Sequence, residues 1–223
     1  MTTDDKDYIR AFMPERIVDP ARAALVIIDL QYATGSRKGA LGRKLQAEGS
    51  TVADYRFDRI EKFVVPNAVR LRDLFSRMQR PVLHVTIGAA RPDAADAPAH
   101  MRPLFVELSN YVGSPDHEIL PELTPLPGEH VLRKTTNGAF ASSHIDSLLR
   151  ALGCNQLYLV GVSTNMCVES TGREASDRGY AVTLVEDACG TTYEDLHHTT
   201  MRNFQRLFGH VRSTDEVIRE LQG

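Results

Sequence analysis

The sequence is short of the features that mark several protein classes. Tryptophan is absent, and there are only three cysteines among 223 residues. Cys154, Cys167 and Cys189 cannot all pair with one another, and the opening stretch MTTDDKDYIR is polar, without the apolar core of an export signal. We therefore expect a reducing, cytoplasmic setting.

Charge of one sign and long hydrophobic runs are also lacking. The 26 Lys and Arg oppose 29 Asp and Glu, a net charge of −3, which argues against nucleic acid as a partner. The apolar run Ala23–Ile28 is far shorter than the ~20 residues of a membrane span, so a membrane partner is not expected either. With 42% hydrophobic and 25% charged residues, the chain reads as one globular domain over residues 1–223.

The motifs of several large enzyme classes are missing. The sequence has neither G-x-x-x-x-G-K-[ST] nor a G-x-G-x-x-G after a strand, which excludes the common phosphate and dinucleotide loops. The segment Gly161–Asn165 lacks the second glycine of a serine nucleophile elbow. There is no H-E-x-x-H, adjacent His197 and His198 would point to different sides of a helix, and no C-x-x-C pair occurs. We expect no metal and no other cofactor.

Several short segments are apolar almost throughout and rich in β-branched residues, which is typical of strands buried on both faces of a parallel sheet. The clear ones are Ala24–Leu30, Val82–Thr86, Leu157–Val162 and Ala181–Glu186. His130–Arg133 is a weaker fifth strand, and Gly209–Arg212 forms a short edge strand. Stretches with helical spacing lie between them, and this alternation predicts a three-layer α/β/α sandwich.

Helix boundaries and irregular regions complete this outline. Pro66 suits the first position of a helix. Three residues suit N-caps of helices, namely Ser143, Thr164 and Thr214. Glycine, proline and charged residues gather in three irregular regions, Ala33–Asp58, Gly88–Pro103 and Gly113–Gly128. The first two follow strands at their carboxyl ends, where open α/β sheets bind ligands, so we expect them to form pocket walls.

Three reactive side chains fall at carboxyl ends of predicted strands. Asp29 ends the first, Lys134 follows His130–Arg133, and Cys167 lies at the start of the helix after Leu157–Val162. Because parallel strands end at one edge of a sheet, these side chains can converge. With Thr164 as N-cap, Cys167 takes the third helical position, where the helix dipole and Lys134 would lower the pKa of the thiol. Asp29 could then serve as general base for a nucleophilic thiol.

The residues alone leave other assignments open. Cys189 also follows a strand, and Asp187 competes with Asp29 as the carboxylate. A lone cysteine beside an apolar strand is most often a small core residue. A lysine after a strand is usually solvated.

Three separated blocks resemble the signature segments of the isochorismatase-like cysteine hydrolases. The blocks are ALVIIDLQ (Ala24–Gln31), KTTNGAF (Lys134–Phe140) and GVSTNMCVESTGREASDRGY (Gly161–Tyr180). The similarity continues through VEDACGT and NFQRLFG, and the strand order fits from about Ala21 to Leu221.

This resemblance has consequences for both fold and site. It implies a six-stranded, mainly parallel sheet flanked by helices, and an Asp–Lys–Cys catalytic triad on Asp29, Lys134 and Cys167. It also implies a cis peptide between Val162 and Ser163. The backbone N–H groups of Ser163 and Cys167 would then form an oxyanion hole.

The family includes nicotinamidases, carbamoyl-amide hydrolases and isochorismate vinyl-ether hydrolases. The D-x-H…H zinc cluster of metal-dependent nicotinamidases is not matched, because His84 falls inside a strand and His100 is isolated. Cys167 within the full motif favours amide chemistry, and TNMCVEST and NFQRLFG are most similar to ureidoacrylate and biuret amidohydrolases. We predict a cysteine-dependent amidohydrolase that cleaves a small amide or ureido compound through a thioester and releases ammonia or an amine. A nicotinamidase-like enzyme and a catalytically silent binding module are the alternatives.

Five side chains are predicted to line the substrate pocket, namely Gln31, Tyr32, Arg91, Phe140 and Gln205. Gln205 would bind the amide. The insertion Ala33–Asp58 departs from the smallest family members and leaves the exact substrate open. The expected partners are the small amide substrate and further copies of the chain in a homo-oligomer, a dimer or a tetramer.

Overall fold

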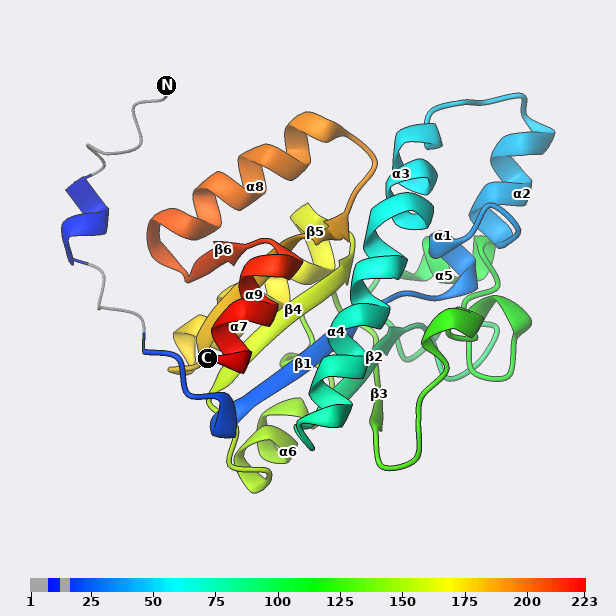
Figure 1. The fold of residues 1–223 in the computed structure, drawn as a ribbon. Coiled ribbons are helices and arrows are strands. Elements are labelled where there is room, and N and C mark those ends of the chain that lie inside the picture. The colour runs from blue at the N-terminus through cyan, green and yellow to red at the C-terminus, as the bar shows by residue number, and fades with distance from the viewer. Residues whose placement is uncertain (1–7, 13–16) are drawn as a thin grey trace.

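A parallel sheet of six strands forms the centre of the protein (Figure 1). This computed structural model describes residues 8–12 and 17–223, so most of the N-terminal stretch on which the export-signal prediction rests lies outside the described residues. The strands are β1 (Ala23–Ile28), β2 (Val82–Ile87), β3 (His130–Lys134), β4 (Gln156–Val162), β5 (Ala181–Gly190) and β6 (His210–Arg212). Their order is β3-β2-β1-β4-β5-β6, and every neighbouring pair is parallel. The predicted fold class is confirmed.

Alternating side chains of the central strand serve two separate cores. In β1, Ala24, Val26 and Ile28 belong to one hydrophobic cluster, whereas Leu25 and Ile27 belong to the other. All six residues of β1 are buried, as expected for a strand covered on both faces. The continuous apolar run in the sequence therefore reflects two cores rather than one.

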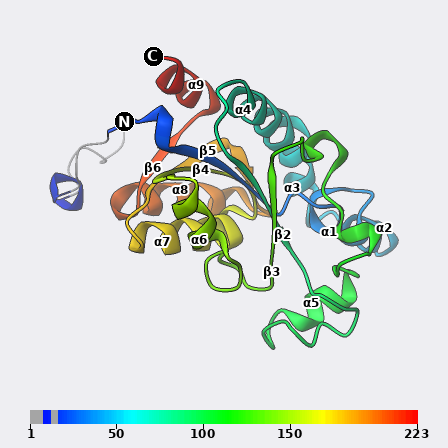
Figure 2. The same cartoon turned by 90° about the horizontal axis from the view of Figure 1, so that it is seen from below.

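Helices cover both faces of the sheet. The helices are α1 (Tyr32–Gly35), α2 (Ala40–Ala47), α3 (Asp54–Arg59), α4 (Val65–Arg77), α5 (Arg102–Glu107), α6 (Ile145–Ala151), α7 (Glu169–Asp177), α8 (Glu194–Leu207) and α9 (Thr214–Gln222). Figure 2 shows α4 and α9 on one side of the sheet and α6, α7 and α8 on the other. No described helix is both long enough and apolar enough to cross a membrane.

The irregular region Ala33–Asp58 is more ordered than predicted. It contains most of α1, the whole of α2 and most of α3. From α3 the chain continues through a π-helical turn (Ile60–Val64) into α4. These helices are short and mostly polar, so the sequence shows no sustained apolar stripe. Pro66 does not begin its helix, because the helical stretch has already started with α3. It stands within this longer helical stretch, directly after the π-helical turn.

Two predicted caps lie one residue away from the real ones. Ser163 rather than Thr164 caps the turn after β4, and Ser213 rather than Thr214 caps α9 in a capping box with Glu216. Thr214 instead donates its backbone N–H and its hydroxyl to Asp187 Oδ1, both over 2.8 Å.

The cap before α6 is likewise shifted by one residue. His144 occupies the N-cap position there, and the Ser143 hydroxyl, one residue earlier, accepts the Ile145 N–H over 3.3 Å. Two adjacent polar residues offer similar sequence signals, and the path of the chain decides between them.

The strand order places a topological switch between β1 and β4. From β1 the chain builds β2 and β3 on one side, and from β4 it builds β5 and β6 on the other. Ligands bind outside the carboxyl ends of strands at such a switch, because the flanking connections diverge there. The segments that follow β1 and β4 therefore form the candidate site.

Candidate active site

Asp29 is the first polar side chain at the switch point. It directly follows β1, is only 2% exposed and has a backbone φ of +54°, a left-handed conformation that is uncommon outside glycine. Its Oδ2 accepts a hydrogen bond from Lys134 Nζ over 2.8 Å. Its Oδ1 is buried and accepts no hydrogen bond from the described residues.

Lys134 is fully buried at the end of β3. Its Nζ donates to Asp29 Oδ2 and to Thr136 O, over 2.8 Å and 3.0 Å. Burial lowers the pKa of the ammonium, but the charges of Asp29 and Cys167 raise it by more, so the net shift is upward and Lys134 is a cation. The alternative assignment of Lys134 as a solvated lysine is thus wrong.

Cys167 lies in the turn between β4 and α7. The turn Thr164–Val168 is π-helical, and the peptide bond between Val162 and Ser163 is cis, as predicted. Cys167 is 8% exposed, and its thiol donates a weak hydrogen bond to Asn137 Oδ1 over 3.8 Å. Since Ser163 is the cap, Cys167 takes the fourth helical position rather than the third.

The three side chains meet, but the pKa of the Cys167 thiol is raised, whereas the sequence analysis expected it to be lowered. Burial and then the charge of Asp29 raise the pKa of Cys167 to about 12, and Lys134 offsets this only in part. Burial also raises the pKa of Asp29, against the charge of Lys134 and contact with Cys167. The expectation of a lowered thiol pKa is wrong, because packing removes water that a helix terminus and one ammonium cannot replace. The resting site holds a neutral thiol beside a carboxyl group.

Two backbone N–H groups of the turn after β4 are candidates for an oxyanion hole. The N–H groups of Met166 and Val168 both donate to Ser163 O, over 3.0 Å and 3.2 Å. Outside the helical turn itself, the N–H groups of Ser163 and Cys167 donate to no backbone carbonyl of the described residues. These are the two groups expected to hold an oxyanion, and that role stays a prediction.

The competing residues have other surroundings. Cys189 is fully buried in β5, and its thiol donates to Leu159 O over 3.6 Å, while burial raises its pKa strongly. Asp187 is occupied by the backbone and hydroxyl of Thr214. Neither lines the cavity that Asp29 and Cys167 share.

This cavity has a volume of about 230 Å³. Its apolar wall comes mainly from α5, its neighbouring loops and the strand ends, and consists of Leu41, Ile87, Met101, Leu104, Phe105, Leu108, Val162 and Met166. Its polar lining consists of Asp29, Thr34, Arg56, Asn110, Asn137, Ser163, Cys167 and Thr192. An apolar body with a few converging polar groups is typical of a small-molecule site. The predicted pocket walls Ala33–Asp58 and Gly88–Pro103 both contribute to it.

The five side chains predicted to line the pocket do not line this cavity. Gln31 is 1% exposed and links two segments, because its Oε1 accepts the Ile87 N–H over 2.7 Å and its Nε2 donates to His117 O over 2.7 Å. Tyr32 is half-buried and lines a different surface hollow.

The other three are also absent from the lining of this cavity. The Arg91 side chain is 71% exposed and pairs with Asp93. Phe140 packs its ring against Tyr180. Gln205 is half-buried on α8 and contributes to none of the described cavities. Position next to a signature block did not reveal which way each side chain points.

Sequence reasoning missed Arg56 and Asn137. Asn137 stands inside the block KTTNGAF, so its proximity to Lys134 was a usable signal. Arg56 lies among the many charges of the insertion, where nothing distinguishes it from exposed arginines.

One group of possible metal ligands exists among the described residues. Ligand atoms of Glu186, His197 and His198 lie within 4.8 Å of one another. Arg59 Nη2 lies 2.9 Å from both His197 Nε2 and Glu186 Oε1, and His197 Nδ1 contacts the Thr164 hydroxyl at 2.9 Å. The guanidinium thus already provides the positive charge there, and burial and hydrogen bonding commit His197 to the fold. The arrangement does not suit a metal ion.

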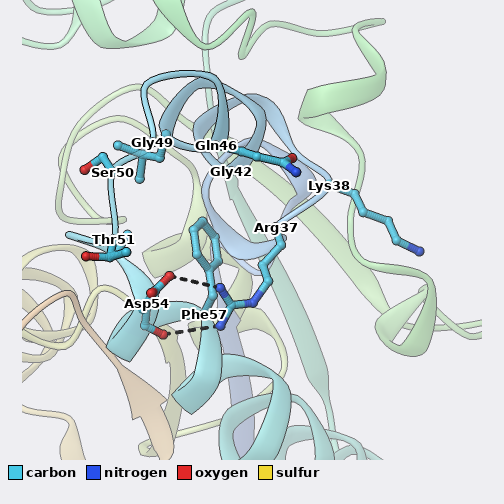
Figure 3. A pocket seen from close by; sticks show the side chains of 11 residues that line it. Arg37, Lys38, Gly42, Gln46, Gly49, Ser50, Thr51, Asp54 and Phe57 are labelled. Carbon is cyan, nitrogen blue, oxygen red and sulfur yellow. Dashed lines mark hydrogen bonds and ion pairs between the residues drawn. The ribbon is translucent and has the colours of Figure 1, made fainter.

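A larger cavity of about 520 Å³ lies between α2 and α3. Figure 3 shows Arg37 paired with Asp54 beside Phe57 in its wall. It shares no lining residue with the cavity of Asp29 and Cys167 and contains no nucleophile with an adjacent base. Size alone therefore does not identify the reactive site.

Fold and site together define a parallel α/β protein with a buried Asp, Lys and Cys group at the switch point of its sheet. The isochorismatase domain matches residues 23–216. The chain belongs to the isochorismatase family, which confirms the resemblance inferred from the signature blocks.

Individual relatives agree with this assignment. The chain is 31% identical over 209 residues to the isochorismatase family protein YwoC of Bacillus subtilis, covering 92% of this chain and 97% of that protein. It is 28% identical over 218 residues to the ureidoacrylate amidohydrolase RutB of Pantoea ananatis, covering 93% and 86%. A cysteine hydrolase from Pseudomonas syringae has the same fold, with a TM-score of 0.78 at 23% identity over 93% of this chain and 96% of that one.

Proposed function

We propose that the protein is an amidohydrolase that cleaves the C–N bond of a small amide, ureido or carbamoyl compound, with Cys167 as nucleophile. The observation that carries this proposal is the buried contact of Asp29 with Lys134 beside the thiol of Cys167, at the wall of a small cavity. The similarity to a ureidoacrylate amidohydrolase over most of the chain supports the amide as the bond that breaks.

In the first half-reaction, the sulfur of Cys167 attacks the carbonyl carbon while Asp29 accepts the thiol proton. A general base is needed at this moment because the pKa of the thiol is raised to about 12. Lys134 holds Asp29 through its Oδ2, which leaves Oδ1 without a partner and able to take the proton. The carbonyl oxygen becomes an oxyanion, which the N–H groups of Ser163 and Cys167 stabilise.

Collapse of this intermediate breaks the C–N bond. The leaving nitrogen takes the proton from Asp29 and departs as ammonia or an amine, and the acyl group remains on Cys167 as a thioester. Water then attacks the thioester carbonyl and gives a proton to Asp29. When the C–S bond breaks, that proton returns to the sulfur, so the resting enzyme is restored.

The setting of the enzyme is part of the same proposal. Cys154, Cys167 and Cys189 are all free in the structure, and a thiol nucleophile must stay reduced, which a cytoplasmic location would provide. The homo-oligomer remains a prediction, which sedimentation of the purified protein would check.

A screen for ammonia release tests the proposal. The purified protein is incubated with small carboxamides, ureido acids and carbamoyl amides, and ammonia is measured with a coupled dehydrogenase. We expect turnover of at least one class. Saturable hydrolysis of a vinyl ether, with no ammonia from any amide, would overturn the amide assignment.

A further inference from the structure

Among the described residues, Arg56 is the one cation that lines the cavity of Asp29 and Cys167. It lies on α3, is only 4% exposed, and comes from the insertion between β1 and α4 (Figure 1). The neighbouring residue Phe57 instead lines the larger cavity between α2 and α3 (Figure 3). The helix α3 therefore separates the two cavities.

The guanidinium of Arg56 is held in place but not neutralised. Its Nε donates to Thr34 O over 2.9 Å, and its Nη1 donates to the Ser163 hydroxyl over 2.6 Å. No carboxylate forms an ion pair with it in the described part of the chain. Its Nη2 makes no hydrogen bond there and is not sealed off from solvent, which places this atom at the cavity surface.

A nearby arginine shows what a structural role looks like. Arg59, one turn of helix later, forms an ion pair with Glu186 Oε1 and donates to two backbone carbonyls, so its charge has a partner within the fold. A buried charge without a partner is costly, so a buried cation of this kind is suited to binding an anionic ligand. Arg56 is buried, preorganised and incomplete in this sense.

The charges around Arg56 point in the same direction. Burial lowers the pKa of its guanidinium to about 10, and the anionic forms of Cys167 and Asp29 are the charges that oppose this shift. Arg56 is therefore still a cation at neutral pH, and it faces the nucleophile. Asp29 is hydrogen-bonded to Lys134, and the raised pKa of Cys167 keeps its thiol neutral, so neither is a permanent counterion for Arg56.

We propose that Arg56 binds a carboxylate of the substrate, so that the site selects small amides or ureido compounds that carry one acidic group close to the scissile bond. This inference rests on the proposed amide hydrolysis and adds the substrate class to it. A guanidinium binds a carboxylate through charge and directed hydrogen bonds, and Nη2 is the donor left for it. The apolar wall formed by Ile87, Phe105 and Leu108 suits a short hydrocarbon link between the carboxylate and the amide.

Paired substrates test this selection. Succinamate and maleamate carry a carboxylate where succinamide and maleamide carry a second neutral amide. For Arg56→Met we expect kcat/KM to fall about 100-fold more for each acid than for its diamide, mainly through KM. Arg56→Lys keeps the charge and should restore part of the preference for the acid. Arg91→Met, which removes an exposed guanidinium outside the cavity, is the matched control and should change neither substrate.

Alkylation of Cys167 gives a readout that needs no turnover. Iodoacetate and iodoacetamide both lose iodide to the same sulfur and differ in one charge. Any change in thiol ionisation or turn geometry therefore cancels in the ratio of their rates. We expect the iodoacetate to iodoacetamide ratio at Cys167 to fall about tenfold in Arg56→Met and to stay at the wild-type value in Arg91→Met. Mass spectrometry of the modified peptide measures both rates.

The outcomes separate the two proposals. If both the substrate preference and the alkylation ratio are unchanged in folded Arg56→Met and Arg56→Lys proteins, Arg56 binds no carboxylate and this inference is wrong, even if amides are hydrolysed. Equal losses for acid and diamide would also overturn it, because Arg56 would then act only by holding Ser163. If no amide is hydrolysed but the ratio falls as expected, the anion site stands and the amidase assignment fails. Should Arg56→Met not fold, Arg56→Lys carries both measurements.

Discussion

At the scale of the residue, the proposed chemistry depends on the pair of Lys134 and Asp29. Both side chains are almost completely buried, and their charged atoms lie 2.8 Å apart. Lys134→Met would leave Asp29 without its cation, so the pKa of Asp29 would rise further. Asp29 would then already carry a proton near neutral pH and could not accept another. The same change removes the charge that lowers the pKa of Cys167. We expect turnover to fall at least about 100-fold and the unfolding free energy by about 3–5 kcal/mol.

The pH dependence of iodoacetamide labelling at Cys167 measures the effect on the thiol. In Lys134→Met, the labelling profile should move to higher pH, and it will report the group of interacting residues as a whole. Lys62→Met is the control, because that lysine is exposed and pairs with Asp58 on the surface. An unchanged profile in folded Lys134→Met protein would show that Lys134 does not influence this thiol.

Sequence and structure agree on some residues of the site and not on others, for physical reasons. Asp29, Lys134 and Cys167 could be expected to meet, since each lies at or shortly after the carboxyl end of a strand and parallel strands end at one edge. The raised pKa of Cys167 could not, because burial depends on packing from several distant segments. Gln31 is polar and well placed, yet its amide is used to link Ile87 to His117.

At the scale of the element, the close approach of β4 to β1 positions the turn that carries Cys167. Gly161 has a φ of +119°, and a Cβ at this position would lie 2.0 Å from Ile28 O. Gly161→Ala should lower the unfolding free energy by about 2–4 kcal/mol and impair turnover, because the shift displaces Ser163 and Cys167 relative to Asp29. Urea unfolding and ammonia release measure the two effects.

Gly153→Ala is the matched control for this change. Gly153 also has a left-handed φ, +70°, but an added Cβ would have nothing within 4 Å. It should cost about 1 kcal/mol and leave turnover intact. Equal effects of the two substitutions would mean that the contact between β4 and β1 is not what positions the turn.

Elements differ in how far the sequence predicts them. The strands were found because runs such as Ala24–Leu30 are apolar on both faces, and the structure moves that strand by only one or two residues at its ends. By contrast, β5 extends to Gly190, four residues beyond the prediction. The apolar run ends at Glu186, but the strand continues past a register shift against β4. The helices α1 to α3 lack an apolar stripe, so Arg56 could not be oriented from sequence.

At the scale of the whole molecule, two hydrophobic cores and the buried ion pair of Asp29 and Lys134 hold the proposed site together. The one group of possible ligands, among residues 8–12 and 17–223, has Arg59 at its centre. We therefore expect dialysis against EDTA to leave ammonia release and the thermal midpoint unchanged. Loss of activity that zinc or manganese alone restores would contradict this and favour a metal-dependent nicotinamidase.

The choice of Cys167 over Cys189 as nucleophile is the central claim. The two thiols differ in place rather than in type, since Cys167 lines the reactive cavity beside Asp29 and Cys189 is sealed in β5. The most direct test is the rate of ammonia release by Cys167→Ser and Cys189→Ser, compared with wild type on the same amide and with folding checked by circular dichroism. We predict that Cys167→Ser folds normally and loses activity at least about 100-fold, because a hydroxyl is far harder to ionise, while Cys189→Ser keeps most of it. Activity retained in Cys167→Ser and lost in a folded Cys189→Ser would contradict the account.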